Sequence, residues 1–180
     1  EQPSSLFEGE SRKHQAAYDA LLARPDGGPN PYRLHAELGQ LMTRVATVVR
    51  HNPELEEAYG TVCQLEQRAR QCSLSDKGGW ANQNVLFVRA LGDMFPVAKA
   101  ILRGAILRDE CRGAHYKPEF AMPHVDAEDP GERRRQAEAW CERFDENNRK
   151  WLKSTVATLS PDGEPQISYE PVDTSVIPPR

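Results

Sequence analysis

Residues 30–57 read NPYRLHAELGQLMTRVATVVRHNPELEE and contain two helix-start signals with a long apolar stripe between them. Asn30 can cap a helix with Pro31 at its first position, because the cap oxygen accepts from free amides and proline lacks an amide that needs a partner. Apolar residues then recur every three or four positions in one wide stripe: Leu34, Leu38, Leu41, Met42, Val45, Val48 and Val49. Asn52 and Pro53 repeat the start signal, and glutamates that suit a helix N-terminus follow. Such a short joint predicts two antiparallel neighbouring helices.

Apolar spacing predicts further helices on both sides of this pair. Upstream, a helix that ends before the turn at 25–29 is marked by His14, Ala17, Tyr18, Leu21 and Leu22. The helix that Asn52 begins should bury Leu55, Tyr59, Val62, Leu65, Ala69 and Cys72. A long helix from about Trp80 to about Glu110 should face inward with Leu86, Ala90, Met94, Val97, Ile101, Leu102 and Ala105. Three long amphipathic helices suffice for one core, so we predict an all-α three-helix bundle over residues 1–116.

Residues 117–180 have a different character and form a polar arm. Residues 132–152 permit a helix with few apolar anchors, namely Ala137, Trp140, Phe144 and Trp151. Residues 154–159 and 166–170 flank the turn sequence SPDGEP and predict a β-hairpin. Because an isolated two-stranded hairpin is marginal in water, we expect the arm to pack on the bundle or on a domain outside this chain.

Composition excludes several classes of protein. The chain has 180 residues and a net charge of -4, which argues against a dedicated nucleic-acid binder. No apolar run reaches the roughly 20 residues of a membrane-spanning helix. The four cysteines lack paired spacing, so a reducing compartment is expected. Residue 1 is Glu rather than Met, and we expect the chain to be a piece of a longer protein.

Signatures of catalysis and cofactor binding are missing from the sequence. It contains no G-x-G-x-x-G, G-x-x-x-x-G-K, H-E-x-x-H or G-x-S-x-G motif, so we predict no catalytic and no cofactor-binding residues. Cys111 and His115 are four residues apart and could act as metal ligands, with His124 and Cys141 completing the set. We favour the alternative, in which Cys111 is structural and no metal site exists.

Arg108 and Arg112 form a like-charge pair near the expected end of the long helix. Their repulsion must be offset by acidic partners, and Asp109 and Glu110 are the nearest candidates. The pair is either a solvated face or a docking surface for acidic groups, which arginine recognises with two parallel hydrogen bonds.

Residues 108–120, RDECRGAHYKPEF, resemble the E-S-R-G-A-H signature of the flavoprotein subunits of succinate dehydrogenase and fumarate reductase. Other stretches resemble the same family in order and spacing: LG at 38–39 through VVR at 48–50, WANQN at 80–84, WLKST at 151–155 and YEPVD at 169–173. Cys111 stands where that family usually has Ser.

This resemblance implies the C-terminal helical domain, a spectrin-repeat-like bundle with a trailing hairpin, of an oxidoreductase. Such an enzyme oxidises succinate to fumarate or catalyses the reverse reaction, in the tricarboxylic acid cycle and electron transport. FAD is expected in an N-terminal domain outside these residues. The expected partners are that flavin domain, an iron–sulfur subunit and, indirectly, a membrane cytochrome b anchor, so the location would be cytoplasmic and peripheral at the inner face of the cell membrane.

Within this implied enzyme, the chain is expected to be structural and inactive alone. The candidate docking residues, which would contact the flavin domain or the iron–sulfur subunit, are Arg108, Glu110, Arg112, His115 and Tyr116. The alternative is a free-standing helical protein-interaction module with no redox role.

Overall fold

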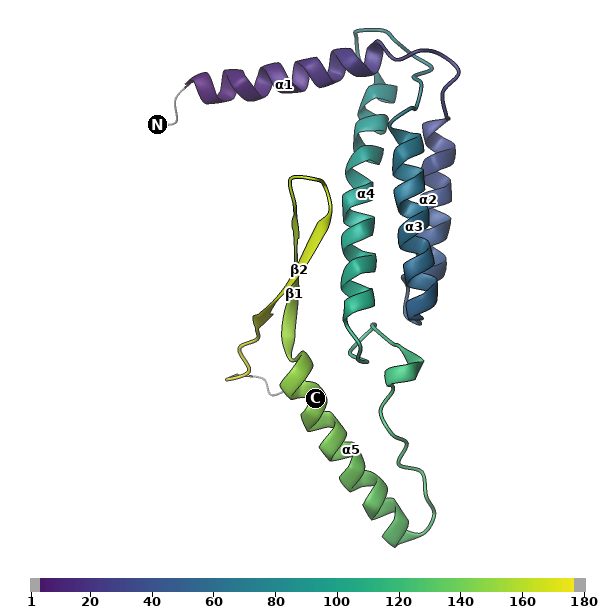
Figure 1. Ribbon diagram of the computed structural model, residues 1–180, viewed down its shortest axis with the longest axis vertical. Helices are drawn as coiled ribbons and strands as arrows, with labels where there is room; N and C mark the ends of the chain where they lie inside the picture. Colours follow the sequence, from purple (N-terminus) through teal and green to yellow (C-terminus); the bar gives the residue numbers. More distant parts are fainter. Residues whose placement is uncertain (1–3, 177–180) are drawn as a thin grey trace. The chain divides into compact units, whose positions relative to one another are not determined.

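The computed structural model describes residues 4–176, which are mostly helical (Figure 1). The helices are α1 (Ser4–Leu22), α2 (Pro31–Val45), α3 (Asn52–Ala69), α4 (Gln83–Leu107), the short 3-10 helix η1 (Pro118–Phe120) and α5 (Pro130–Trp151). The strands β1 (Lys153–Leu159) and β2 (Pro165–Pro171) form an antiparallel hairpin near the C-terminus. The predicted helical class with a C-terminal hairpin is confirmed.

The described residues form two compact units, and α2, α3 and α4 each contribute to both. The first unit contains the described residues up to Gln40 together with Thr61–Phe95. The second contains Leu41–Gly60 and the described residues from Pro96 onward. The division between residues 116 and 117 that the sequence suggests stays a prediction.

Side-chain caps begin two helices of the first unit. The Oδ1 atom of Asn30 accepts a hydrogen bond from the Tyr32 amide at 2.9 Å, as predicted for the start of α2. At the start of α4, the Oδ1 atom of Asn82 accepts from the Val85 amide at 3.1 Å. The buried Asn82 side chain also donates to two carbonyls of the preceding loop, so it ties this loop to the helix.

The core of the first unit lies between its segments of α2, α3 and α4. Its buried apolar residues include Leu34, Leu38, Val62, Leu65, Val85, Val88, Leu91 and Phe95. The rings of Tyr32 and Phe87 stack with their centroids 4.2 Å apart, which joins α2 to α4. Arg68 pairs with Glu37 at 2.6 Å, which joins α3 to α2, although exposed pairs of this kind add little stability.

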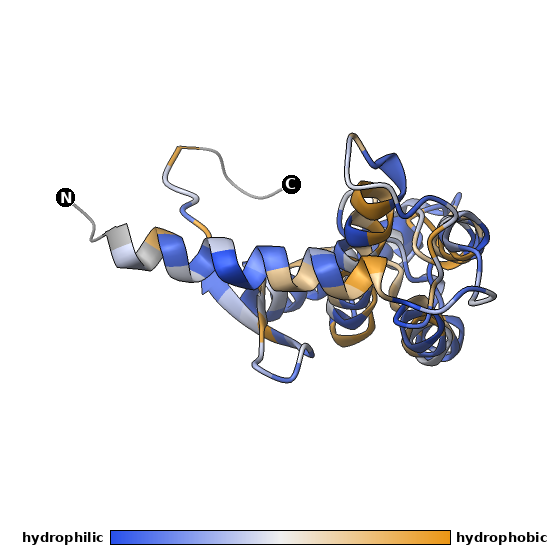
Figure 2. Ribbon diagram, turned by 90° about the horizontal axis from the view of Figure 1, so that it is seen from above, coloured by the Kyte–Doolittle hydropathy of each residue, from blue (hydrophilic) through white to orange (hydrophobic). Residues whose placement is uncertain are grey.

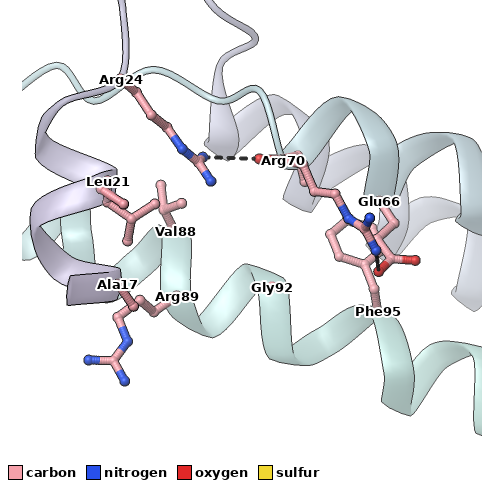
Figure 3. A pocket seen from close by; sticks show the side chains of 11 residues that line it. Ala17, Leu21, Arg24, Glu66, Arg70, Val88, Arg89, Gly92 and Phe95 are labelled. Atoms are coloured by element: carbon pink, nitrogen blue, oxygen red, sulfur yellow. Dashed lines mark hydrogen bonds and ion pairs between the residues drawn. The ribbon is translucent and has the colours of Figure 1, made fainter. Parts of the chain in front are cut away.

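Helix α1 contacts the rest of the first unit through its C-terminal end. Leu21 is its one described side chain that is buried, and Figure 2 shows hydrophilic colours along most of the helix. A pocket of about 470 Å³ lies between α1, α3 and α4, with Leu21, Val88 and Phe95 in its lining (Figure 3). Arg24 closes the end of α3 by donating to the Ala69 and Cys72 carbonyls at 3.4 and 3.2 Å.

The prediction of which α4 residues face the core is largely wrong. Leu102 and Ala105 are buried as expected, but a second set is between 42% and 61% exposed: Leu86, Met94, Val97 and Ile101. Ala90 is exposed as well. The residues that fill the core are Val85, Val88, Leu91, Phe95 and Ala98. Because α4 carries adjacent apolar residues, such as Val85 with Leu86, its periodicity fits two faces, and only packing selects between them.

The helix boundaries near residue 50 also differ from prediction. Helix α2 ends at Val45, and Val48 and Val49 lie outside it, about half exposed. The chain there forms a parallel bridge instead: the Arg50 amide donates to the Tyr116 carbonyl at 2.9 Å, and the Tyr116 amide donates to the Val48 carbonyl at 3.1 Å. β-branched residues favour such extended backbone over helix.

Asn52 does not cap α3, contrary to prediction. Its buried Oδ1 atom has no hydrogen-bond partner among the described residues, and the Leu55 amide donates to the His51 carbonyl at 3.0 Å. The Asn52 Nδ2 atom instead donates to Asp109 at 3.2 Å. A long-range contact has replaced the local cap.

The hairpin lies alongside the C-terminal half of α4 (Figure 1). Its strands pair from Lys153↔Pro171 to Leu159↔Pro165. At its turn, the Glu164 carboxylate accepts hydrogen bonds from Lys99 at 2.8 Å and from Tyr59 at 2.5 Å. These two bonds lower the pKa of Glu164 below its ordinary value, and the bond from Lys99 has the larger effect. The hairpin therefore has the supporting surface that a two-stranded sheet requires.

Two leucines of α4 provide a matched test of its inward face. We expect Leu91→Ala to lower the free energy of unfolding by about 2–5 kcal/mol, because it opens a cavity among buried side chains. Leu86→Ala removes an exposed side chain and should cost no more than about 0.5 kcal/mol. Urea denaturation of the 180-residue chain measures both changes. Equal losses would show that both faces of α4 are packed.

Candidate functional site

Residues 108–117 form a tight corner between α4 and η1, which we call the corner. Arg112 and His115 face each other across a two-residue turn: the Arg112 amide donates to the His115 carbonyl at 2.9 Å, and the His115 amide donates to the Arg112 carbonyl at 3.0 Å. Gly113 holds this turn at a φ of 58°, a value that favours glycine. Helix α4 ends at Leu107 rather than at about Glu110 as predicted, so residues 108–110 belong to the corner and not to the helix.

Glu110 is fully buried between two arginines. Its Oε1 atom accepts from Arg108 Nε at 2.7 Å, and its Oε2 atom accepts from Arg112 Nε at 3.1 Å. A buried carboxylate is costly unless charged donors surround it, and two guanidinium groups supply them here. Glu110 thus offsets the arginine repulsion, as the sequence suggests.

Arg108 joins the corner to the polar arm. Its guanidinium donates to the Trp151 carbonyl at 2.6 Å, to the Lys153 carbonyl at 2.9 Å and to Thr155 Oγ1 at 2.9 Å. The Trp151 carbonyl belongs to the end of α5, where carbonyls lack helical partners. The side chain of Trp151 is buried as the predicted anchor of the arm. One arginine therefore positions both α5 and β1.

Arg112 makes a second connection to α5. It donates to Asn148 Oδ1 at 3.0 Å while remaining paired with Glu110. The two arginines thus reach successive turns near the end of the same helix, and the buried carboxylate holds both in place.

Lys117 is a second buried charge in the corner, and the sequence analysis missed it. Its Nζ atom donates to Asp109 at 2.9 Å and to the Ile106 carbonyl at 3.1 Å. Burial by itself would raise the pKa of Asp109, but hydrogen bonds from Lys117 and Asn52 together hold that pKa below its ordinary value. Asp109 therefore forms its ion pair with Lys117 and not with Arg108 or Arg112.

His115 is held between a donor and an acceptor. Its Nδ1 atom lies 2.6 Å from a terminal nitrogen of Arg50, and its Nε2 atom lies 2.8 Å from the Arg108 carbonyl. A guanidinium only donates and a carbonyl only accepts, so Nε2 carries the proton and the ring is neutral. Burial has the largest effect on the pKa of His115 and lowers it. The hydrogen bond to the Arg108 carbonyl raises this pKa, and the positive charge of Arg50 lowers it, so the pKa stays below its ordinary value.

The metal-ligand alternative for Cys111 and His115 finds no support in these contacts. Both ring nitrogens of His115 are engaged, and Cys111 Sγ donates to the Lys117 carbonyl at 3.1 Å. Within residues 4–176 no group of three or more His, Cys, Asp or Glu side chains could hold a metal ion. None of the four cysteines forms a disulfide bond within the described part of the chain. The structural role of Cys111 stays a prediction.

Comparison with known proteins assigns the chain to a family. Residues 35–180 match the family described as fumarate reductase flavoprotein C-term. The chain belongs to this family. It is 34% identical over 178 residues to the succinate dehydrogenase flavoprotein subunit of Bacillus subtilis (strain 168), an alignment that covers 98% of this chain and 26% of that protein. It is 26% identical over 158 residues to the fumarate reductase flavoprotein subunit of Escherichia coli (strain K12), covering 88% of this chain and 23% of that protein.

Solved structures show the same fold. A variant of the E. coli quinol fumarate reductase superposes with a TM-score of 0.77 at 20% sequence identity and covers 100% of this chain and 27% of that one. A Mycobacterium smegmatis Sdh1 structure superposes with a TM-score of 0.65 at 22% identity and covers 91% of this chain and 24% of that one. The chain therefore spans about a quarter of the length of its relatives.

The flavoprotein family implies FAD, and the described residues do not fit a dinucleotide site. Such a site places a glycine-rich loop between a parallel strand and a helix N-terminus. The described strands form an antiparallel hairpin, and the glycines with positive φ lie in three separate turns: Gly27, Gly113 and Gly163. Residues 4–176 also contain no helix long and apolar enough to cross a membrane.

The five candidate docking residues lie together in this flavoprotein domain, but they differ in accessibility. The Glu110 side chain is buried and that of Arg108 is only 14% exposed, and both are paired within the chain. Arg112 and His115 are intermediate, and Tyr116 is exposed. The observed contacts give the arginines and Glu110 an internal role, and docking by any of the five stays a prediction. Besides Lys117, the sequence pattern did not single out Arg50, although the VVR stretch that contains it carries part of the family resemblance.

The buried charge cluster predicts a large effect of Glu110→Gln. This change keeps the shape of the side chain but leaves two partly buried arginines without their carboxylate, and breaking a buried ion pair costs about 3–5 kcal/mol. The matched control is Asp93→Asn, an exposed acid on α4, which should change stability by no more than about 0.5 kcal/mol. Denaturant unfolding measures both, and a Glu110→Gln variant as stable as the control would contradict the cluster's role.

Two histidines of the second unit should titrate in opposite directions from the ordinary value of 6.5. The hydrogen bond that His51 Nδ1 donates to the Glu119 carboxylate, at 2.7 Å, raises the pKa of His51, whereas burial lowers that of His115. NMR titration of the ring signals measures both values. The assignment fails if His115 titrates above His51.

The same shifts set the pH dependence of stability. As the pH falls through 6.5, the unfolded chain protonates His115 while the folded chain resists, so stability is lost on acidification. His51 adds stability below 6.5 that disappears as the pH rises through its folded pKa. Stability should therefore fall less steeply on acidification in His115→Gln and more steeply in His51→Gln than in the unmodified chain.

Proposed function

We propose that the chain is the C-terminal helical domain of a flavoprotein that oxidises succinate to fumarate, or catalyses the reverse, and passes electrons to an iron–sulfur subunit. The family match over residues 35–180 carries this proposal. The 34% identity to a succinate dehydrogenase flavoprotein subunit along 98% of the chain supports it. FAD, bound elsewhere in the same polypeptide, supplies the redox chemistry when it is present.

The role of this domain within the enzyme is structural and docking. The charged groups of the corner that could act in catalysis are already engaged: Glu110 by two arginines, and His115 by Arg50 and the Arg108 carbonyl. Catalytic acids and bases need access to a substrate, whereas these groups are held by internal partners. The charged groups of the corner thus hold the domain together internally, and other parts of the enzyme assemble on its surface.

A peripheral position at the inner face of the cell membrane follows from this assignment. One relative of known structure is a quinol-fumarate reductase solved with menaquinol molecules, and it shares the fold with a TM-score of 0.74. By analogy, the iron–sulfur subunit and a cytochrome b anchor would connect this domain indirectly to a membrane quinone.

The test is to purify the full flavoprotein that the gene encodes, with and without residues 1–180, from cells that also express its iron–sulfur subunit. We expect the full protein to show flavin absorbance, oxidise succinate and retain the iron–sulfur subunit, and the truncated protein to lose that subunit. The 180-residue chain alone should be colourless and inactive. A flavin band or succinate oxidation in this chain alone would contradict the division of roles. A start codon close to Glu1 would instead support the free-standing interaction module.

A further inference from the structure

Arg50, which contacts the corner through His115, differs in its partners from Arg108 and Arg112. Its guanidinium donates to the Thr47 carbonyl at 2.8 Å and to the Ala46 carbonyl at 3.0 Å, and a terminal nitrogen contacts His115 at 2.6 Å. These partners are neutral. Among residues 4–176, Arg50 forms no ion pair, whereas Arg108 and Arg112 share a buried carboxylate.

This arrangement leaves a fixed positive charge uncompensated. Burial lowers the pKa of Arg50, which reflects the loss of water around its charge. A guanidinium also has more N–H donors than the three contacts use. The three contacts fix the orientation of the guanidinium, so its remaining donors are preorganised to receive a carboxylate.

Arg50 borders an apolar groove in the second unit. The groove has a volume of about 420 Å³ and runs between the C-terminal half of α4 and the hairpin, with Arg50, Arg108 and His115 at the corner. Its apolar walls are formed by Val97, Ala100, Ile101, Gly104, Ala157 and Ile167. Val97 and Ile101 are 59% and 45% exposed, although both are large and apolar. An apolar groove beside an unpaired cation fits a polypeptide segment with one acidic side chain among apolar ones.

We propose that this groove binds a segment of the flavin-bearing part of the same flavoprotein, with an aspartate or glutamate of that segment paired to Arg50. The segment's apolar side chains lie on Val97 and Ile101. This inference rests on the proposed function. It commits to the same polypeptide because the relatives are about four times as long as the matched region, and a covalent tether gives such a segment a high effective concentration.

The site of binding can be identified by photo-cross-linking in the full flavoprotein. A photoreactive phenylalanine derivative replaces Ile101 in the groove wall or, as a control, Arg103, an exposed α4 residue that does not line the groove. We expect mass spectrometry to find an Ile101 cross-link to a peptide of the same polypeptide outside residues 1–180, with an Asp or Glu close to the linked residue. The Arg103 position should not yield that peptide.

A charge exchange then tests the pair itself. Arg50→Glu should reduce the Ile101 cross-link to background, and replacing the identified acid by Arg in the same protein should restore it, whereas Arg103→Glu should change nothing. Because Arg50 also supports the corner, Val97→Lys provides a second test that leaves all Arg50 contacts intact and should also abolish the cross-link.

Several outcomes would overturn this inference. They are no cross-link, a cross-link only within residues 1–180 or to the iron–sulfur subunit, a linked peptide without an acidic residue, and failure of the charge exchange to restore the yield. Each can occur while the full protein retains FAD and oxidises succinate, so failure here is distinguishable from failure of the proposed function.

Discussion

The buried carboxylate of Glu110 is the interaction on which the C-terminal part of this domain depends. Because Glu110 is buried away from water, its charge must be balanced by nearby donors, and Arg108 and Arg112 provide them. Each arginine has further donors, and these reach Trp151, Lys153 and Asn148 in the arm. One buried acid therefore orients two cations, and the two cations orient the end of α5 and the start of β1.

A charged junction of this kind fixes the geometry of its partners: the intact pairs add little net stability, although removing one partner is costly. Apolar contacts at the same place would tolerate small rotations of α5, whereas hydrogen bonds between charged groups require a defined geometry. The hairpin is held at its other end by Glu164, which binds Lys99 and Tyr59. Fixed at both ends, the hairpin forms the second wall of the groove along α4.

The contacts of the corner also explain why its histidine is neutral and why Arg50 has no counter-ion in the described part of the chain. His115 accepts a hydrogen bond from Arg50 and donates one to the Arg108 carbonyl, so it connects the two arginines without compensating the charge of either. Arg108 has Glu110 as its partner, but the partners of Arg50 among residues 4–176 are all neutral. Within one polar cluster, one arginine is thus satisfied internally and another is available to a carboxylate from outside.

The sequence by itself determined the features that depend on neighbouring residues. The cap at Asn30, the helical class and the hairpin at 153–171 follow from local spacing and turn chemistry, and Glu110 lies two residues from each of the arginines it binds. Tertiary packing selected the buried face of α4, since adjacent apolar residues satisfy the helical period equally well. It also decided that Asn52 binds Asp109 instead of capping α3, and that Arg50 meets His115 across 65 positions of the chain. These outcomes depend on contacts between segments far apart in sequence, whose free energies outweigh local preferences and leave no periodic signal.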